Sequence, residues 1–190
     1  MSKSTSRLFI GTKGHRSFYG KELSLFIESK KSAEEIIAER VKGLDLRTHT
    51  IKNKKMLSQK EMKEVRKKIK NRTATMKEYR NYEMTKRYNT NRKIAVDDFW
   101  REEKNRIRNN SPTRAWTPEQ AMDILAGRKP KYKGRTIHGH HTFSAKRFPH
   151  LAKNHEVIYP ATFEEHLHGW HGGNWNMSIP GKRITKIESF

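Results

Sequence analysis

The sequence predicts an α+β protein in which a basic, mainly helical region precedes a small histidine-rich unit. Three features indicate this class: short apolar runs separated by glycines near the N-terminus, a stretch from Leu44 to Ser111 without glycine or proline, and a histidine block near the C-terminus. A chain of 190 residues suits one domain with an appendage or two small domains. We expect three parts, residues 1–43, 44–114 and 115–190.

Residues 1–43 look like a small α/β unit. The apolar runs at 8–10 and 23–27 predict strands between glycine-containing turns. A capping-box pattern at Ser32–Glu35 predicts the start of a helix, and Gly43 is placed to end it. Because no catalytic constellation is visible in this unit, we expect it to serve docking, dimerisation or folding.

Residues 44–114 predict a basic helical arm. A second capping box at Ser58–Glu61 precedes an apolar stripe at helical spacing, which predicts one long amphipathic helix: Met62, Val65, Ile69 and Met76, which Tyr79 and Tyr82 extend. Residues 52–114 contain 21 Lys and Arg against 8 Asp and Glu. Such a helix either lies along a phosphate backbone or is a solvated helix that packs through its narrow stripe.

Asparagine-rich segments predict where this arm is interrupted. The segments 88–92 and 109–111 look like breaks within or after the helices, and Pro112 marks a boundary. Beyond it, a capping box at Thr117–Gln120 begins a short helix that Gly127 ends.

The composition limits the classes of function. The net charge of +22 is most easily balanced by a polyanion, and nucleic acid is the first candidate. The hydrophobic fraction of 33% leaves a proper core to only part of the chain. No apolar run is long enough to span a membrane or to form a secretory signal, so we expect a cytoplasmic protein. Without cysteine, any metal must be held by His, Asp, Glu or Asn.

The histidine block carries the chemistry. Eight of the ten histidines lie between His138 and His171. Residues 136–145 predict a short hairpin, and residues 164–170 predict a helix capped by Thr162. Histidine is the commonest metal ligand, so the block predicts a metal centre.

Adjacent His140 and His141 point in opposite directions if the backbone is extended. One of them can then bind a metal while the other activates water. His166 and His171 are five residues apart, so they reach one ion only if the final helical turn is widened or frayed, and the glycines that follow favour this. His168 is the alternative ligand.

The order of these motifs resembles a known family. They are Gly139-His140-His141, Pro149-His150-Leu151, the run from Ile158 to Thr162, Glu165-His166 and the segment Trp170–Asn174. Over residues 117–177 the chain is similar to the HNH nuclease superfamily, whose core is a ββα-metal finger, and within it to the GHH-signature nucleases of bacterial polymorphic toxins.

The resemblance implies roles for individual residues. It makes His140, His166 and His171 the ligands of one divalent ion, Mg²⁺, Mn²⁺, Ni²⁺ or Zn²⁺, and His141 the general base. Asn154 matches the residue that orients the base or braces the loop. The cations nearest in sequence, expected to grip phosphate, are Arg135, Lys146 and Arg147. Glu165 is either a partner of a ligand imidazole or an acid in the first helical turn.

These features predict a weakly specific metal-dependent endonuclease that cuts DNA, with RNA as the alternative substrate. The resemblance implies a toxin delivered into the cytoplasm of a target cell and an acidic immunity protein as its partner. The alternatives are a phage, prophage or defence-system endonuclease and a non-catalytic, zinc-stabilised nucleic-acid-binding protein. In a further alternative, residues 1–110 dock a delivery machine or a larger assembly.

Overall fold

The computed structural model describes residues 31–49 and 55–187. Its helices are α2 (Ala33–Arg40), α3 (Gln59–Lys70), α4 (Met76–Arg108) and α5 (Pro118–Leu125). Two small antiparallel sheets pair β1 (Lys131–Tyr132) with β2 (Arg135–Thr136) and β3 (His138–His141) with β4 (Ile158–Ala161). Two short 3₁₀ helices are η1 (Pro149–Leu151) and η2 (His155–Val157), and η3 (Glu165–Trp170) is a π-helix. This mixture confirms the α+β class, while the strands expected at 8–10 and 23–27 lie outside the described residues.

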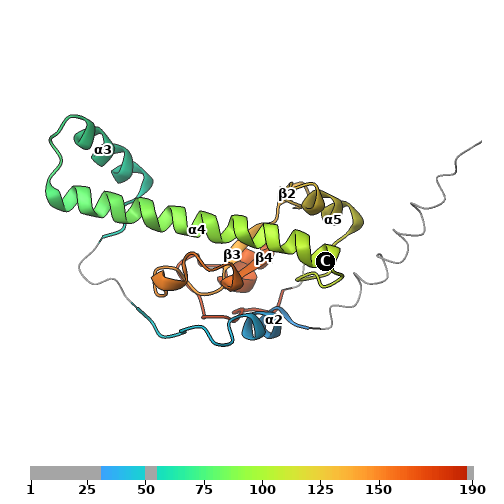
Figure 1. Ribbon diagram of the computed structural model, residues 1–190. Coiled ribbons are helices and arrows are strands. Elements are labelled where there is room, and N and C mark those ends of the chain that lie inside the picture. The colour runs from blue at the N-terminus through green and yellow to red at the C-terminus, as the bar shows by residue number, and fades with distance from the viewer. Residues whose placement is uncertain (1–30, 50–54, 188–190) are drawn as a thin grey trace, which may run out of the picture.

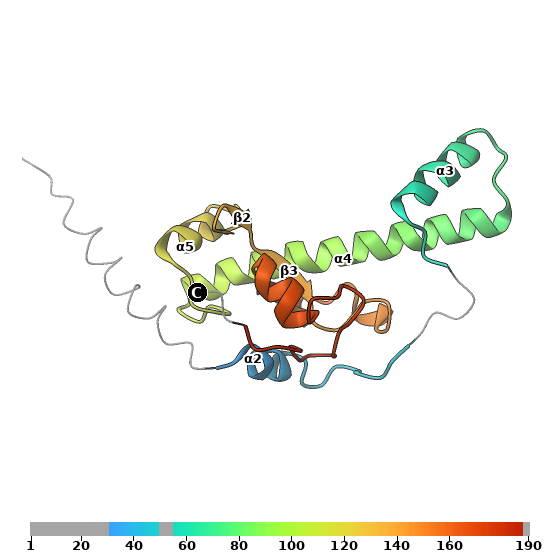
Figure 2. The same ribbon diagram turned by 180° about the vertical axis from the view of Figure 1, so that it is seen from behind.

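Helix α4 is the axis of the molecule (Figure 1). Helix α3 folds back on its N-terminal part, and the β3–β4 sheet packs against its C-terminal half. Helix α2 lies on the other side of that sheet, as the reverse view shows (Figure 2). None of the helices in the described ranges is long and apolar enough to cross a membrane.

The hydrophobic core extends across both boundaries expected from the sequence. One cluster joins Ile37 of α2, Phe99 of α4, Ile158 of β4 and Trp170 of η3. A second cluster packs Ile107 of α4 against the region of α5 and β2. Helices α2 and α4 are thus packed into the histidine-rich region, and the division at residues 43 and 114 remains a prediction.

Capping boxes start the helices. The predicted boxes at Ser32–Glu35, Ser58–Glu61 and Thr117–Gln120 are confirmed, each with the serine or threonine hydroxyl accepting from the backbone N–H three residues later. A fourth box, Thr75–Glu78, begins α4. The predicted continuation of one helix from Ile69 to Met76 is therefore wrong, because the chain turns at residues 71–75 and this box nucleates a new helix.

Helix α4 also passes unbroken through residues 88–92, so the break expected there is wrong. Tertiary packing explains the difference: Thr85, Ala95 and Phe99 are buried on one face, and this burial outweighs the weak helix propensity of asparagine. The break at 109–111 is confirmed, since α4 ends at Arg108.

The hairpin expected at residues 136–145 is wrong as well. Strand β3 pairs with β4 across an intervening loop, with His138 opposite Ala161 and His141 opposite Ile158. The loop of residues 142–157 buries Phe148 and Leu151, and this non-local burial selects the long-range pairing. We call this segment the 142–157 loop.

Candidate metal centre

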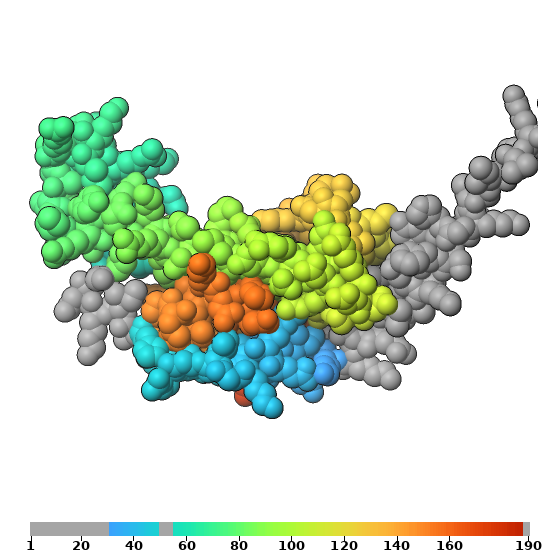
Figure 3. All heavy atoms as spheres, viewed as in Figure 1, coloured from blue at the N-terminus to red at the C-terminus, as the bar shows by residue number. Residues whose placement is uncertain are grey.

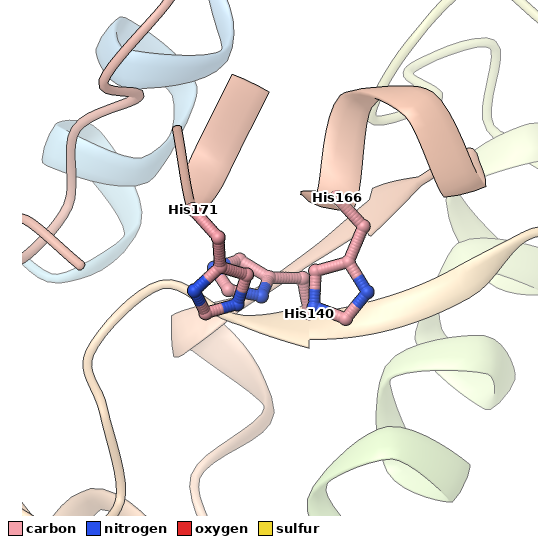
Figure 4. A group of neighbouring side chains, drawn as sticks. All are labelled: His140, His166 and His171. Atoms are coloured by element: carbon pink, nitrogen blue, oxygen red, sulfur yellow. The ribbon is translucent and has the colours of Figure 1, made fainter. Parts of the chain in front are cut away.

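Three histidines converge between β3 and the helical turn η3 (Figure 4). His140 comes from β3, His166 from the start of η3, and His171 directly follows the last residue of η3. One nitrogen of each imidazole lies within 4.8 Å of the other two. The ring centroids are 4.6 Å apart for His140 and His166 and 5.1 Å apart for each of the other pairs. We call these residues the three-histidine cluster.

The backbone conformation of η3 explains how His166 and His171 come together although they are five residues apart. Residues Glu165–Trp170 form a π-helix, in which hydrogen bonds join residues five apart instead of four. This wider turn brings His171 over His166, which an α-helix would not do. The predicted cap is present, because the Thr162 hydroxyl accepts from the Glu165 N–H at 3.3 Å.

A hydrogen bond fixes the orientation and tautomer of His171. Its Nδ1 lies 2.6 Å from the carbonyl oxygen of Met177. Because a carbonyl oxygen can only accept, Nδ1 carries the proton and Nε2 keeps its lone pair. A backbone carbonyl that holds the far nitrogen of a ligand histidine is the usual outer partner at metal sites.

Burial keeps two imidazoles of the cluster neutral, those of His140 and His166. It lowers the pKa of His140 well below the usual range, with the neighbouring His166 and His171 as further causes. Burial likewise lowers the pKa of His166 to about 4. Neutral imidazole is the form that binds a metal, so the donors fit a divalent ion with open positions left for other ligands.

His141 lies beside the cluster and is held differently. Only 8% of its surface is exposed, and its Nε2 donates to the carbonyl oxygen of Ala152 at 3.2 Å. The lone pair is therefore on Nδ1. Burial, and then the positive charge of Arg92, lower the pKa of His141 to about 4, so it is neutral and able to accept a proton near pH 7.

A cavity of about 460 Å³ connects these groups. It is lined by all four histidines together with Arg92 and Tyr88 of α4, Lys146, Trp175, Asn176 and Ser178. Arg92 was not among the site residues expected from the sequence. The spacing of Arg92 from Tyr88 and Ala95 could have indicated its place in the site. Residues three and four apart lie on the same face of a helix, and here that face meets the sheet.

The cations expected to bind phosphate differ in position. Lys146 lines the cavity. The guanidinium of Arg135 lies 4.8 Å from the centre of the Phe163 ring, and that of Arg147 lies 5.9 Å from the centre of the Phe148 ring. Neither arginine is among the residues that line this cavity.

Two polar residues brace the surroundings. The Asn154 side chain accepts from the backbone N–H of Glu156 at 2.9 Å, which supports the turn leading into β4. Both carboxylate oxygens of Glu165 accept from Arg114, at 2.9 and 3.0 Å, and the carboxylate also caps the backbone N–H of Thr162. Glu165 thus has the position of a paired acid in the first helical turn.

The remaining histidines lie outside the cluster. His168 is exposed on another side of η3. His155 pairs with Glu156 at 3.1 Å. The wall of the site is aromatic instead: Trp170 is buried with its ring 5.0 Å from that of His140, and Trp175 is 51% exposed beside His166 and His171.

Comparison with known families agrees with this geometry. Residues 82–162 match the sequence model of a family described as GHH signature containing HNH/Endo VII superfamily nuclease toxin. Over these residues the chain is similar to that family of nuclease toxins. The match begins within α4, so the GHH region includes Arg92, and it ends at Thr162, just before η3. Neither the curated proteins nor the solved structures compared with the chain gave a match.

The matched family is one of nuclease toxins, and the candidate site draws on residues within the match and beyond it. GHH-region residues supply His140, His141 and the 142–157 loop, and η3 adds His166 and His171 from beyond the matched stretch. The site therefore depends on sequence both inside and outside the region that defines the family.

Proposed function

We propose that the chain is a metal-dependent endonuclease that hydrolyses phosphodiester bonds of DNA with little sequence specificity. The observation that carries this proposal is the convergence of three imidazoles beside His141 in one cavity that Arg92 and Lys146 also line. The order of β3, β4 and η3 fits a ββα-metal finger, in which two strands and a helix surround one ion.

The three-histidine cluster would hold one divalent ion. Its nitrogen donors suit Zn²⁺, Ni²⁺ or Mn²⁺ better than Mg²⁺, which prefers oxygen. A bound ion of this kind supplies Lewis-acid stabilisation of the charge that develops on the phosphate and on the leaving oxygen. His171 is positioned for this by Met177, and Trp170 limits the space around His140.

His141 acts as the general base. Its Nδ1 takes the proton from the attacking water, while the carbonyl of Ala152 holds the opposite side of the ring. Arg92 and Lys146 bind the negative phosphate. The phosphate charge then offsets the positive charge of Arg92, so the pKa of His141 rises toward the range that suits a general base. Once the product leaves, the positive charge of Arg92 is no longer offset by phosphate, and it favours loss of the proton from His141.

The substrate and context follow from charge and family. The basic face of α3 and α4 would follow a phosphate backbone away from the site, with RNA as the alternative to DNA. A net charge of +22 also suits an acidic immunity protein, and a toxin of this family would act after delivery into the cytoplasm of a target cell. A phage, prophage or defence-system endonuclease remains the alternative context.

A cleavage assay tests the proposal. Full-length protein is incubated with plasmid, single-stranded DNA and RNA in Mg²⁺, Mn²⁺, Ni²⁺ or Zn²⁺. The variant His141→Ala should bind metal normally and cut about 10²–10⁴-fold more slowly, the usual contribution of a general base. His155→Ala is the matched control, because that histidine lies outside the cluster and should leave the rate unchanged.

Two outcomes would overturn it. Full activity of His141→Ala would remove the assigned base. Tight nucleic-acid binding without cleavage in any of the four metals would instead indicate a non-catalytic, zinc-stabilised nucleic-acid-binding protein.

A further inference from the structure

A second group of histidine and carboxylate side chains, the types that ligate metal ions, lies away from the three-histidine cluster. Asp45 and His49 follow α2, and His150 belongs to η1 in the 142–157 loop. Three potential ligand atoms, one from each residue, lie within 4.8 Å of one another. All three residues are exposed, so the group is open to an ion from solution.

The group is already arranged by its own contacts. The Nε2 of His49 lies 3.0 Å from the Asp45 Oδ2, and the His49 and His150 rings meet edge to face with centroids 4.4 Å apart. The Nε2 of His150 donates to the backbone carbonyl of Asp45 at 2.7 Å. Since the carbonyl only accepts, the lone pair of His150 is on Nδ1. One imidazole therefore has the fixed tautomer typical of a ligand held from behind.

We propose that Asp45, His49 and His150 form a second metal site, which takes a transition-metal dication such as Zn²⁺. Two imidazole nitrogens and one carboxylate oxygen suit Zn²⁺ and its neighbours, whereas Mg²⁺ and Ca²⁺ require mainly oxygen donors. The remaining positions on the ion are filled by water, as the exposure of the group allows.

Arg47 would compete with a metal ion for the carboxylate of Asp45. Its guanidinium bonds both oxygens of Asp45, at 2.9 and 2.8 Å, and this holds the pKa of the Asp45 carboxyl well below its usual range. The carboxylate is thus ionised and ready to bind. Arg47 is 82% exposed, and an exposed ion pair contributes little, so a dication can displace it. Removing Arg47 should then strengthen metal binding.

Binding at this site would fasten two distant segments together. His49 already donates its backbone N–H to the carbonyl of Arg147 at 3.0 Å, and the surface view shows the segment after α2 bordering the 142–157 loop (Figure 3). Two residues beyond His150, the Ala152 carbonyl holds His141. An ion here would stiffen the loop that orients His141. This consequence rests on the proposed function, whereas the metal binding itself does not.

Zinc stoichiometry of the full chain, measured by equilibrium dialysis, separates the two sites. We expect wild type to bind two ions per chain. The triple variant Asp45→Asn, His49→Ala, His150→Ala should bind one, and the double variant His166→Ala, His171→Ala should also bind one. His168→Ala serves as the control, because this exposed histidine belongs to neither group, and it should still bind two.

The outcomes distinguish the two proposals. If the triple variant binds as much zinc as wild type, the second site does not exist. If the double variant binds as much zinc as wild type and the triple variant binds less, the second site stands and the proposed catalytic centre fails. Circular dichroism of the zinc-free proteins confirms folding, and Arg47→Ala gives an independent check, since it should lower the dissociation constant at the second site.

Hydrogen exchange tests the effect on the loop without relying on activity. In the double variant His166→Ala, His171→Ala, zinc should slow exchange of the Leu151 and Asn154 amides, which are hydrogen-bonded within the loop. Zinc at about 100 times its dissociation constant should also raise the melting temperature by about 5–10 °C. An unchanged melting temperature in saturating zinc would contradict the proposed clamp.

Discussion

At the scale of single residues, Arg92 and burial act together on the imidazoles of the site. The charge of Arg92 is among the causes that lower the pKa values of His140, His141 and His166, although burial is the larger cause for each. The result is a set of histidines that stay neutral where an exposed histidine would begin to charge. Neutral imidazole is the form that can bind a metal ion or accept a proton.

This neutrality makes the stability of the metal-free protein depend on pH. The unfolded chain takes up protons near pH 6.5, whereas His141 and His166 resist them until about pH 4 in the native state. The unfolded state therefore binds more protons between these values, so the free energy of unfolding falls as the pH is lowered from about 6.5 to about 4. His141 alone should account for a loss on the order of 2–3 kcal/mol.

Urea denaturation in a chelator at pH 7 and pH 4.5 measures this effect. The variant His141→Gln, which cannot titrate, should show a smaller loss than wild type. His155→Gln is the control, because that residue is partly exposed outside the cluster. Equal losses in wild type and His141→Gln would show that burial of His141 does not produce the pH dependence.

At the scale of elements, the end of η3 decides whether His171 reaches the cluster. The π-helix is followed by Gly172 and Gly173, whose φ angles of 56° and 85° lie in the left-handed region. A Cβ added at Gly172 would meet the Ile184 side chain at 2.9 Å. The turn after His171 is thus both conformationally special and closely packed.

The variant Gly172→Ala should weaken zinc binding at the three-histidine cluster by about 10–100-fold, the range found when the supports of a ligand are changed. The physical reason is that the added methyl group pushes Ile184 and displaces the neighbouring His171. Titration calorimetry in the Asp45→Asn, His49→Ala, His150→Ala background isolates this site.

Gly134→Ala is the matched control. Gly134 also has a positive φ of 77°, but nothing lies within 4 Å of an added Cβ. It should cost about 1–2 kcal/mol of stability through the backbone alone and leave zinc affinity unchanged. The same loss of zinc affinity in both variants would point to general destabilisation instead of a local effect at His171.

At the scale of the whole molecule, one long helix carries basic charge and also lines the cavity of the three-histidine cluster. Helix α4 carries Arg92 to the cavity and extends away from it to the α3–α4 hairpin (Figure 1). The lysines on α3 are exposed at residues 63, 67 and 70. This layout suits a substrate that runs from the site along the helix, because each phosphate contact releases counterions.

DNA affinity should therefore fall steeply with salt. If 6–10 phosphates are contacted, the affinity drops by about 10³–10⁵ between 50 and 200 mM salt. Replacing Lys63, Lys67 and Lys70 by glutamine should reduce the slope of log affinity against log salt by up to about 3. Fluorescence anisotropy of a labelled duplex in chelator gives the slope without cleavage.

A charge-matched control separates position from net charge. Lys42, Lys182 and Lys186 are exposed on the α2 side, where Arg183 pairs with Glu34. Their replacement by glutamine removes the same number of charges and should change the slope much less. If both triple variants lower the slope equally, the hairpin has no special role in binding.

The sequence by itself determined the local features of this protein. Three capping boxes, the end of α4 at Arg108 and the cap at Thr162 were predictable because each depends on a few neighbouring residues. The GHH motif indicated a nuclease-like centre, and the spacing of His166 and His171 indicated a widened turn. Both features can be read directly from the order of residues in the chain.

Only the tertiary structure decided the pairings made at a distance. The partner of β3, the unbroken course of α4 and the place of Arg92 beside His141 all depend on which apolar surfaces are buried together. Such burial is a property of segments far apart in sequence, and local propensity does not contain it. For the same reason, the contact between Asp45 and His150, which are 105 residues apart, could not be predicted from the sequence.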